Sequence, residues 1–314
     1  MNRFNTNIIS TLQSDSNRWL GFFYVLIAGI GFGFLGIFGK LAFQNNLQVY
    51  ELLTFRFLLA GVLIGLGLLV FRKNDLRLTR RQMVTSIFLG VLGYATFSSL
   101  YFMSIQGLSV AIAAMLLFCF PFFVIVGETI FFKEKISLQK LTSLLMCLLG
   151  IFLLIYSPNS SLSEMSLASY IEIDKLKYFA YAITAALTYS IYVLASGRLQ
   201  KDTPAGGSSF FVIFSAGIAL LIFNFSQIQF EKILIMNNFL IVLGIAVVCT
   251  IIPIMTFLLG LQRLSSGTAS IIVTVEPVVA TIAGYLILKE SLTLSQMIGS
   301  GIVLLGITLI QLKS

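Results

Sequence analysis

Residues 266–290 read SGTASIIVTVEPVVATIAGYLILKE, and this stretch decides the fold. A helix that crosses a bilayer needs about 20 predominantly apolar residues, a length that the stretch provides. One carboxylate, Glu276, lies inside it and is followed directly by Pro277. An acidic or basic residue at the centre of a membrane helix costs about 2.5–3.5 kcal/mol on insertion scales, so Glu276 is a functional candidate by default.

The same stretch has a second copy earlier in the chain. Residues 101–155 align with residues 257–311 without a gap, at one constant offset (277 − 121 = 156). The matching positions are Gln106 with Gln262, Leu108 and Ser109 with Leu264 and Ser265, Ala113 with Ala269, Pro121 with Pro277, Lys133 and Glu134 with Lys289 and Glu290, and Leu149, Gly150 and Ile151 with Leu305, Gly306 and Ile307. A duplicated unit explains this agreement. The copies differ at the acidic position, because Glu276 corresponds to Phe120.

Composition places the whole chain in a membrane. Hydrophobic residues make up 58% of the 314 residues, charged residues make up 10%, and the mean hydropathy is +1.00, which together indicate a polytopic membrane protein. The chain has no histidine, so histidine metal ligands and imidazole bases are excluded. Its three cysteines lie far apart in apolar runs and indicate neither a disulfide framework nor a metal site. We expect no metal, no cofactor, no nucleic acid partner and no enzymatic activity.

Two short turns carry a resemblance to a known family. They read KEKIS (133–137) and KESLT (289–293), and each follows a proline-containing span and precedes a glycine-containing one. With the length and the duplication, this pattern resembles the EamA-type members of the drug/metabolite transporter superfamily. The resemblance runs from about residue 20 to residue 312. It implies an all-α integral membrane protein with ten transmembrane helices, arranged as two five-helix repeats.

The apolar runs divide the chain into two halves. We expect spans at 20–43, 49–71, 83–104, 109–131, 138–157, 176–199, 206–225, 239–261, 267–288 and 294–312. Residues 1–157 form the first repeat, with a polar cytoplasmic tail at 1–18, residues 158–175 form a linker, and residues 176–314 form the second repeat. An odd number of spans in each repeat makes the two halves run in opposite directions through the membrane, as in many transporters.

The distribution of basic residues predicts the orientation. With the N-terminus in the cytoplasm, fourteen of the 20 lysines and arginines lie inside and five outside, the remaining one being Arg56 within a span. This bias predicts that both termini are cytoplasmic in a bacterial-type cytoplasmic membrane. The turn at 133–137 is then cytoplasmic, and the turn at 289–293 external.

Two charged residues within spans are the main site candidates. Glu276 could bind a proton or a substrate amine, since apolar surroundings favour its neutral form. It could also be a structural acid that holds the proline-distorted turn. Arg56 lies in LLTFRFLLAG, an arrangement similar to the family's second helix, and could bind a substrate carboxylate or pair with Glu276. Alternatively it bonds carbonyl groups or extends its charged end toward the interface.

Other residues are assigned to the cavity wall or to structure. Tyr94, Ser98 and Tyr101 recur on one face of span three, where they either line a cavity or pack. Pro121 and Pro277 are expected to interrupt their helices. Glu134 and Glu290 are expected to cap the starts of the helices that follow them.

These features predict a secondary transporter, a permease or exporter that moves a small organic metabolite, such as an amino acid or a derivative, by alternating access. The alternatives are an intramembrane lipid-handling protein and a channel-like facilitator. The expected partners are the metabolite, the lipid bilayer and, if Glu276 titrates, protons. A monomer and a homodimer both remain compatible with the sequence, and so do import and export.

Overall fold

The computed structural model describes residues 2–108, 110–155, 173–289 and 291–312. Within these ranges every regular element is a helix, and ten spans are long and apolar enough to cross a membrane. This confirms the predicted all-α fold with ten membrane helices. Glu290 and residues 156–172, which include most of the predicted linker, lie outside the described residues.

The first half contains five spans, three of which are built from more than one helix. Its elements are α1 (Asn2–Gly33), α2 (Leu35–Gln44), α3 (Val49–Phe71), the 3-10 helix η1 (Lys73–Leu76), α4 (Arg80–Phe88), the π-helix η2 (Leu89–Ala95), α5 (Thr96–Ser104), α6 (Val110–Leu117), α7 (Phe120–Phe132) and α8 (Leu138–Ile155). The helix α1 includes the backbone of the predicted tail. Residues 2–18 contain neither glycine nor proline, so no helix breaker separates the tail from the first span.

The second half repeats this order. Its elements are α11 (Ile173–Leu199), α12 (Ala205–Asn224), α13 (Glu231–Leu234), α14 (Met236–Ala246), the π-helix η3 (Val247–Ile251), α15 (Ile252–Leu261), α16 (Ser266–Ile272), the 3-10 helix η4 (Val273–Val275), α17 (Glu276–Leu288) and α18 (Leu294–Gln311). Five helices begin at the offset seen in the sequence: α12 and α3 (205 − 49 = 156), α14 and α4 (236 − 80), α15 and α5 (252 − 96), α17 and α7 (276 − 120), and α18 and α8 (294 − 138). The duplication therefore extends to helix boundaries.

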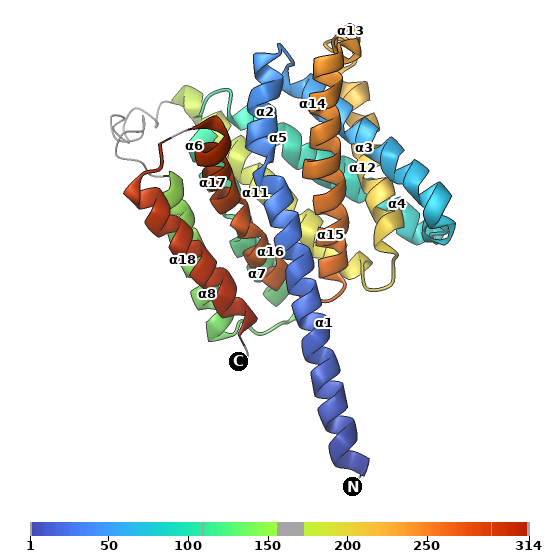
Figure 1. Cartoon of the computed structure of the whole chain (residues 1–314), viewed down its shortest axis with the longest axis vertical. Helices are drawn as coiled ribbons and strands as arrows, with labels where there is room; N and C mark the ends of the chain where they lie inside the picture. Colours follow the sequence, from blue (N-terminus) through green and yellow to red (C-terminus); the bar gives the residue numbers. More distant parts are fainter. Residues whose placement is uncertain (1, 109, 156–172, 290, 313–314) are drawn as a thin grey trace.

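The two halves run in opposite directions. Both termini lie at the lower end of the view in Figure 1. There the Arg18 guanidinium donates a hydrogen bond to the carbonyl of Ile310 at 2.9 Å, and the Gln139 side-chain amide donates to the carbonyls of Leu309 and Leu312. The start of α8 thus lies beside the end of α18. The turn at 133–137 is at the lower end and the turn before α18 is at the upper end, as inverted repeats require.

The halves pack into each other. The main helix pairs each join one half to the other, namely α3 with α12, α1 with α15, α5 with α11, and α8 with α18. Small residues permit the closest approach: a Cβ placed on Gly150 of α8 would lie 2.7 Å from the carbonyl oxygen of Gly299 in α18. Glycine at such crossings lets two membrane helices come within backbone contact.

The cap of α8 differs from the sequence expectation for Glu134, while the expectation for Glu290 falls on a residue outside the described part of the chain. At the start of α8 the Ser137 hydroxyl accepts a hydrogen bond from the amide of Lys140 at 3.1 Å, and Thr293 caps α18 through the amide of Gln296. Glu134 makes no such contact within the described residues. Its exposed carboxylate lies 3.8 Å from the Lys140 ammonium instead. Serine and threonine take the cap because their short hydroxyl reaches the first-turn amides directly.

Candidate substrate site

The ninth span is broken where Glu276 lies. It begins as α16, tightens into the 3-10 helix η4, and continues as α17, whose first residue is Glu276. Pro277 has no amide hydrogen to donate and hinders a regular turn before it, so the helix is interrupted at this point. The break places a carboxylate at the N-terminus of a helix in the middle of the span, where the helix dipole favours negative charge.

Two glycines of α1 pack against this break. A Cβ on Gly29 would lie 2.4 Å from Cγ1 of Val275, and a Cβ on Gly33 would lie 2.9 Å from the carbonyl oxygen of Glu276. The small-xxx-small pair in the first span therefore lets α1, from the first half, reach the broken helix of the second half. Span one is itself interrupted at Phe34, one residue further on.

The fourth span carries the equivalent break. Helix α6 ends at Leu117, a turn follows, and α7 begins at Phe120 with Pro121 in its first turn. The Ser190 hydroxyl of α11 donates a hydrogen bond to the carbonyl of Phe120 at 3.0 Å. Each half thus places its first long helix against the broken helix of the other half. The two breaks differ chemically, with an acid at one and an aromatic ring at the other.

Arg56 is buried on α3 and makes no side-chain hydrogen bond in the part of the chain that the structure describes. Its side chain is 5% exposed, its guanidinium carbon lies 4.3 Å from the centre of the Phe57 ring, and its Nε is enclosed without any partner. Within the described residues no acceptor bonds its terminal nitrogens, and these nitrogens are not among the enclosed unpaired atoms. The terminal nitrogens therefore keep a small accessible surface.

Glu276, like Arg56, has no bonding partner in the described residues. Its side chain is only partly buried, and it makes no hydrogen bond or ion pair within the described part of the chain. Arg56 and Glu276 nevertheless lie close enough for their charges to interact through the interior. Tyr94, Tyr101 and Cys249 lie in the same region of the interior as Glu276. The structure therefore brings both charged candidates to one region without joining them in an ion pair.

Span three supplies further polar residues to the region of Arg56 and Glu276. Tyr94 lies in the π-helix η2, and Ser98 and Tyr101 follow on α5. The Ser98 hydroxyl is buried and has no hydrogen-bond partner among the described residues. π-Helical turns are frequent at functional sites because they alter which residues face inward. We name Arg56, Tyr94, Ser98, Tyr101, Tyr189 and Glu276 the central polar cluster.

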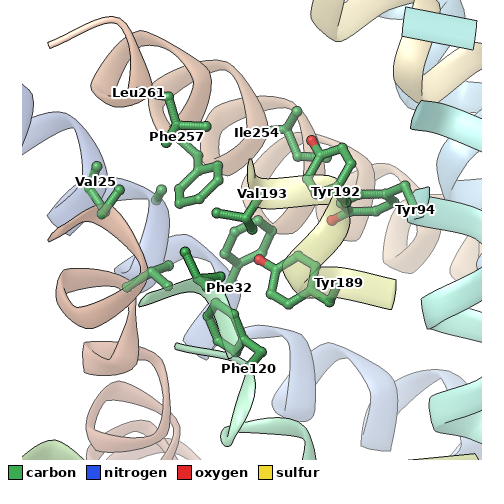
Figure 2. Close-up of a cluster of buried hydrophobic side chains, with 14 of the residues drawn as sticks. Val25, Phe32, Tyr94, Phe120, Tyr189, Tyr192, Val193, Ile254, Phe257 and Leu261 are labelled. Carbon is green, nitrogen blue, oxygen red and sulfur yellow. The ribbon is translucent and has the colours of Figure 1, made fainter. Parts of the chain in front are cut away.

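Aromatic rings line the cluster. Figure 2 shows Tyr94 and Tyr192 side by side, with Tyr189 nearby and Phe120 beside it. The ring centres are 5.3 Å apart for Tyr94 and Tyr192, 6.0 Å for Tyr189 and Tyr192, and 4.6 Å for Phe120 and Tyr189. Phe97 joins Tyr94 to Tyr189 at 5.0 and 4.4 Å. These side chains come from α5, α7, α11 and η2, so the cluster lies between the halves.

Two buried carboxylates join the halves near the ends of the bundle. At the upper end Glu51 contacts the Lys232 ammonium at 3.0 Å and accepts from the amides of Gln48 and Gln229 at 2.7 and 3.2 Å. At the lower end Glu128 contacts the Lys140 ammonium at 2.7 Å and accepts from the amide of Gly267 at 2.7 Å. Each carboxylate belongs to the first half and bonds a backbone amide of the second.

Sequence reasoning underestimated these two acids. Neither was among the site candidates, yet both are buried, Glu128 pairs with Lys140, and each bonds an amide of the other half. The backbone amides that bond them, of Gln229 and Gly267, lie more than a hundred residues away in the sequence, so no local pattern indicates these contacts. No group of acidic and cysteine residues suited to a metal ion occurs in the described residues.

The geometry defines a class of protein: a polytopic membrane protein of two inverted halves with a polar cluster between them, whose two charged members form no ion pair in the described residues. The model of the EamA-like transporter family matches residues 19–156 and 176–312, so this chain belongs to that family.

Known proteins resemble the chain over most of its length. An "uncharacterized transporter" of Archaeoglobus fulgidus is 27% identical over 241 residues, covering 77% of this chain and 81% of that protein. The "S-adenosylmethionine/S-adenosylhomocysteine transporter" of Chlamydia trachomatis is 25% identical over 260 residues, covering 81% and 78%. A solved crystal structure with 15% sequence identity superimposes with a TM-score of 0.77, covering 94% of this chain and 96% of that one, which shows the fold alone.

Proposed function

We propose that this protein is a secondary transporter that carries a small organic metabolite bearing an amino group and a carboxylate. The observation that carries the proposal is the central polar cluster, in which Arg56 and Glu276 lie near each other with neither hydrogen-bonded nor ion-paired within the described residues. An unpaired charge inside a membrane protein is costly, and such residues commonly mark substrate or ion pathways. Opposite charges on separate helices suit the two ends of an amino acid or a derivative.

The aromatic lining narrows the substrate chemistry. Rings beside a carboxylate favour organic cations and flat apolar groups through cation–π and stacking contacts. The relative from Chlamydia trachomatis is named for a sulfonium amino acid derivative and its demethylated product. Both belong to the class that an acid, a guanidinium and several tyrosines would recognise. Amino acids and S-adenosyl derivatives are therefore the first compounds to test.

The mechanism that fits this architecture is alternating access. The breaks in the fourth and ninth spans are packed against α11 and α1, so motion of one half against the other would reshape the space around Glu276. The contacts of Glu51 and Glu128 would separate in turn to open each end. We place both termini in the cytoplasm and the protein in a bacterial-type cytoplasmic membrane, on the charge bias of the loops.

The experiment has two steps. A thermal-shift screen of the purified protein against amino acids and S-adenosyl derivatives identifies a ligand, because specific binding stabilises the folded state. Counterflow of the labelled ligand into preloaded proteoliposomes then tests for a carrier. We expect saturable counterflow that Arg56→Ala reduces at least tenfold and that the exposed-site control Glu134→Gln leaves unchanged. Flux that does not saturate and shows no counterflow would indicate the channel-like alternative. Binding without any flux would refute transport.

A further inference from the structure

A buried carboxylate joins α7 to the lower end of α16. The Glu128 side chain is 3% exposed. One of its oxygens accepts a hydrogen bond from the amide of Gly267 at 2.7 Å, and the other contacts the Lys140 ammonium at 2.7 Å. The same ammonium lies 3.3 Å from the hydroxyl of Ser265, the residue that caps α16. The start of α16, in the second half, is therefore bonded to α7 and α8, in the first half.

This contact lies below the two helix breaks. Helix α7 begins at Phe120, whose ring lines the central polar cluster, and α16 leads through η4 to Glu276. Glu128 follows Phe120 by eight residues (128 − 120 = 8), and Gly267 precedes Glu276 by nine (276 − 267 = 9). The contact is thus about 12 to 14 Å along the helices from the breaks. Over this distance α7 and α16 pack side by side (Figure 1).

The layer between the contact and the breaks is apolar. Val124 and Ile125 of α7 are 0% and 3% exposed, and Ile271 and Ile272 of α16 are both 0% exposed. A Cβ placed on Gly267 would lie 3.1 Å from Cγ1 of Ile125, so the glycine brings the two helices close together. Side chains packed at the density of a protein interior leave no room for a polar metabolite between these helices.

The internal duplication shows what is particular to the lower end. At the offset of 156 residues, the acid, the glycine and the lysine of this contact correspond to Gly284, Ala111 and Gln296 (128 + 156 = 284; 267 − 156 = 111; 140 + 156 = 296). The equivalent helices at the upper end, α17 and α6, therefore carry no ion pair at these positions. The duplicated fold by itself does not require Glu128 and Lys140.

We propose that the contact between α7 and α16 is the cytoplasmic gate of the central polar cluster, and that Glu128 is the latch that holds this gate shut. The proposal rests on the proposed carrier and deepens it by naming the helices that separate at the lower end, which the charge bias places in the cytoplasm. Glu128 and Lys140 both belong to the first half, so they stay paired when α16 moves away. Opening then breaks the bonds to Gly267 and Ser265 and leaves no buried charge without its partner, which would be costly.

The test measures how fast a thiol in the cluster reacts from each side of the membrane. The reporter is Ser98→Cys in a cysteine-free background, and the probe is an anionic methanethiosulfonate that does not cross membranes, applied to vesicles of either orientation. We expect Glu128→Gln to raise the rate from the cytoplasmic side about tenfold, which corresponds to about 1.4 kcal/mol, and to lower the rate from the external side. Glu134→Gln is the matched control, because Glu134 lies beside the same lysine but is 45% exposed, and it should change neither rate.

A cross-link tests the gate with the latch in place. Cγ1 of Ile125 lies 3.1 Å from the Cβ position of Gly267, so Ile125→Cys with Gly267→Cys would bring two thiols within reach of a disulfide. Oxidation of this pair should abolish the reaction of Ser98→Cys from the cytoplasmic side, preserve the reaction from the external side, and be reversed by a reducing agent. Peptide mass spectrometry would follow position 98 alone. The cross-link decides the matter even if Glu128→Gln does not fold.

The outcomes separate the gate from the carrier. Equal acceleration from both sides by Glu128→Gln would overturn the latch, because general loosening has no preferred side. An unchanged cytoplasmic rate after oxidation of the cysteine pair would overturn the gate alone. Reaction of Ser98→Cys from neither side in otherwise unchanged protein would overturn the carrier, and the gate with it.

Discussion

Lys140 contacts two carboxylates of very different burial, which permits a controlled test of what joins the two halves at the lower end. Glu128 is 3% exposed and lies 2.7 Å from the ammonium, while Glu134 is 45% exposed and lies 3.8 Å away. Glu128 also accepts from the amide of Gly267, the second residue of α16. The same lysine thus reports on a buried pair that joins the halves and on a solvated pair that does not.

We expect Glu128→Gln to lower the free energy of unfolding by about 3 kcal/mol. Removing one partner of a buried ion pair costs about 3–5 kcal/mol, and the lower value applies because glutamine keeps an oxygen for Gly267. Lys140→Met should cost a similar amount. The double variant should lose only about 1–2 kcal/mol, because no buried charge is then left alone. Glu134→Gln should cost less than about 1 kcal/mol, as exposed pairs do.

The assay is equilibrium unfolding in nonionic detergent titrated with dodecyl sulfate, followed by circular dichroism. The coupling energy follows from a double-mutant cycle of four proteins: the wild type, both single variants and the double variant. Additive losses in the double variant would refute the reasoning, because they would mean that the two side chains do not depend on each other. A loss for Glu134→Gln equal to that for Glu128→Gln would refute the role of burial.

Four further predictions follow from single positions. Cysteines at Ser137 and Ser291, in a cysteine-free background, should react with an impermeant maleimide from opposite faces of the membrane, the first from the cytoplasm; labelling from one face would contradict the inverted repeats. Arg56→Lys should retain more counterflow than Arg56→Ala if charge alone is needed, and equal loss would show that the planar fork is required. Glu276→Gln should abolish accumulation driven by a pH gradient while sparing counterflow, and undiminished accumulation would exclude Glu276 as the proton carrier. Lys289, the residue that follows α17, has φ 56°. Lys289→Gly should raise the free energy of unfolding by about 1 kcal/mol, because glycine adopts this conformation without strain. A lower free energy of unfolding would mean that the lysine side chain contributes more than the backbone strain costs.

Much of the fold could be predicted because membrane helices obey simple rules of length and polarity. The offset of 156 residues between the two sequence copies around Pro121 and Pro277 also separates the first residues of five helix pairs. The site candidates Arg56 and Glu276 were found because a charge in an apolar run stands out. These rules act along the chain, so they locate spans and outlying residues well.

What could not be predicted depends on contacts across the halves. Glu51 and Glu128 lie near span ends, where an acid is unremarkable, and only the packed structure shows them bound to Gln229 and Gly267. The left-handed conformations of Lys133 and Lys289 were missed for a related reason. Glycine or asparagine is the usual residue there, and lysine gives no local signal of positive φ.

The difference between Phe120 and Glu276 bears on why the two halves belong to one polypeptide. A single half inserted in both orientations and paired with itself would place two acids, or none, at its centre. Joining the halves in one chain lets the two breaks hold different residues at the same structural position. One break then carries an acid and the other an aromatic ring, so the two breaks differ in chemistry. Phe120→Glu would restore the symmetry and remove that distinction.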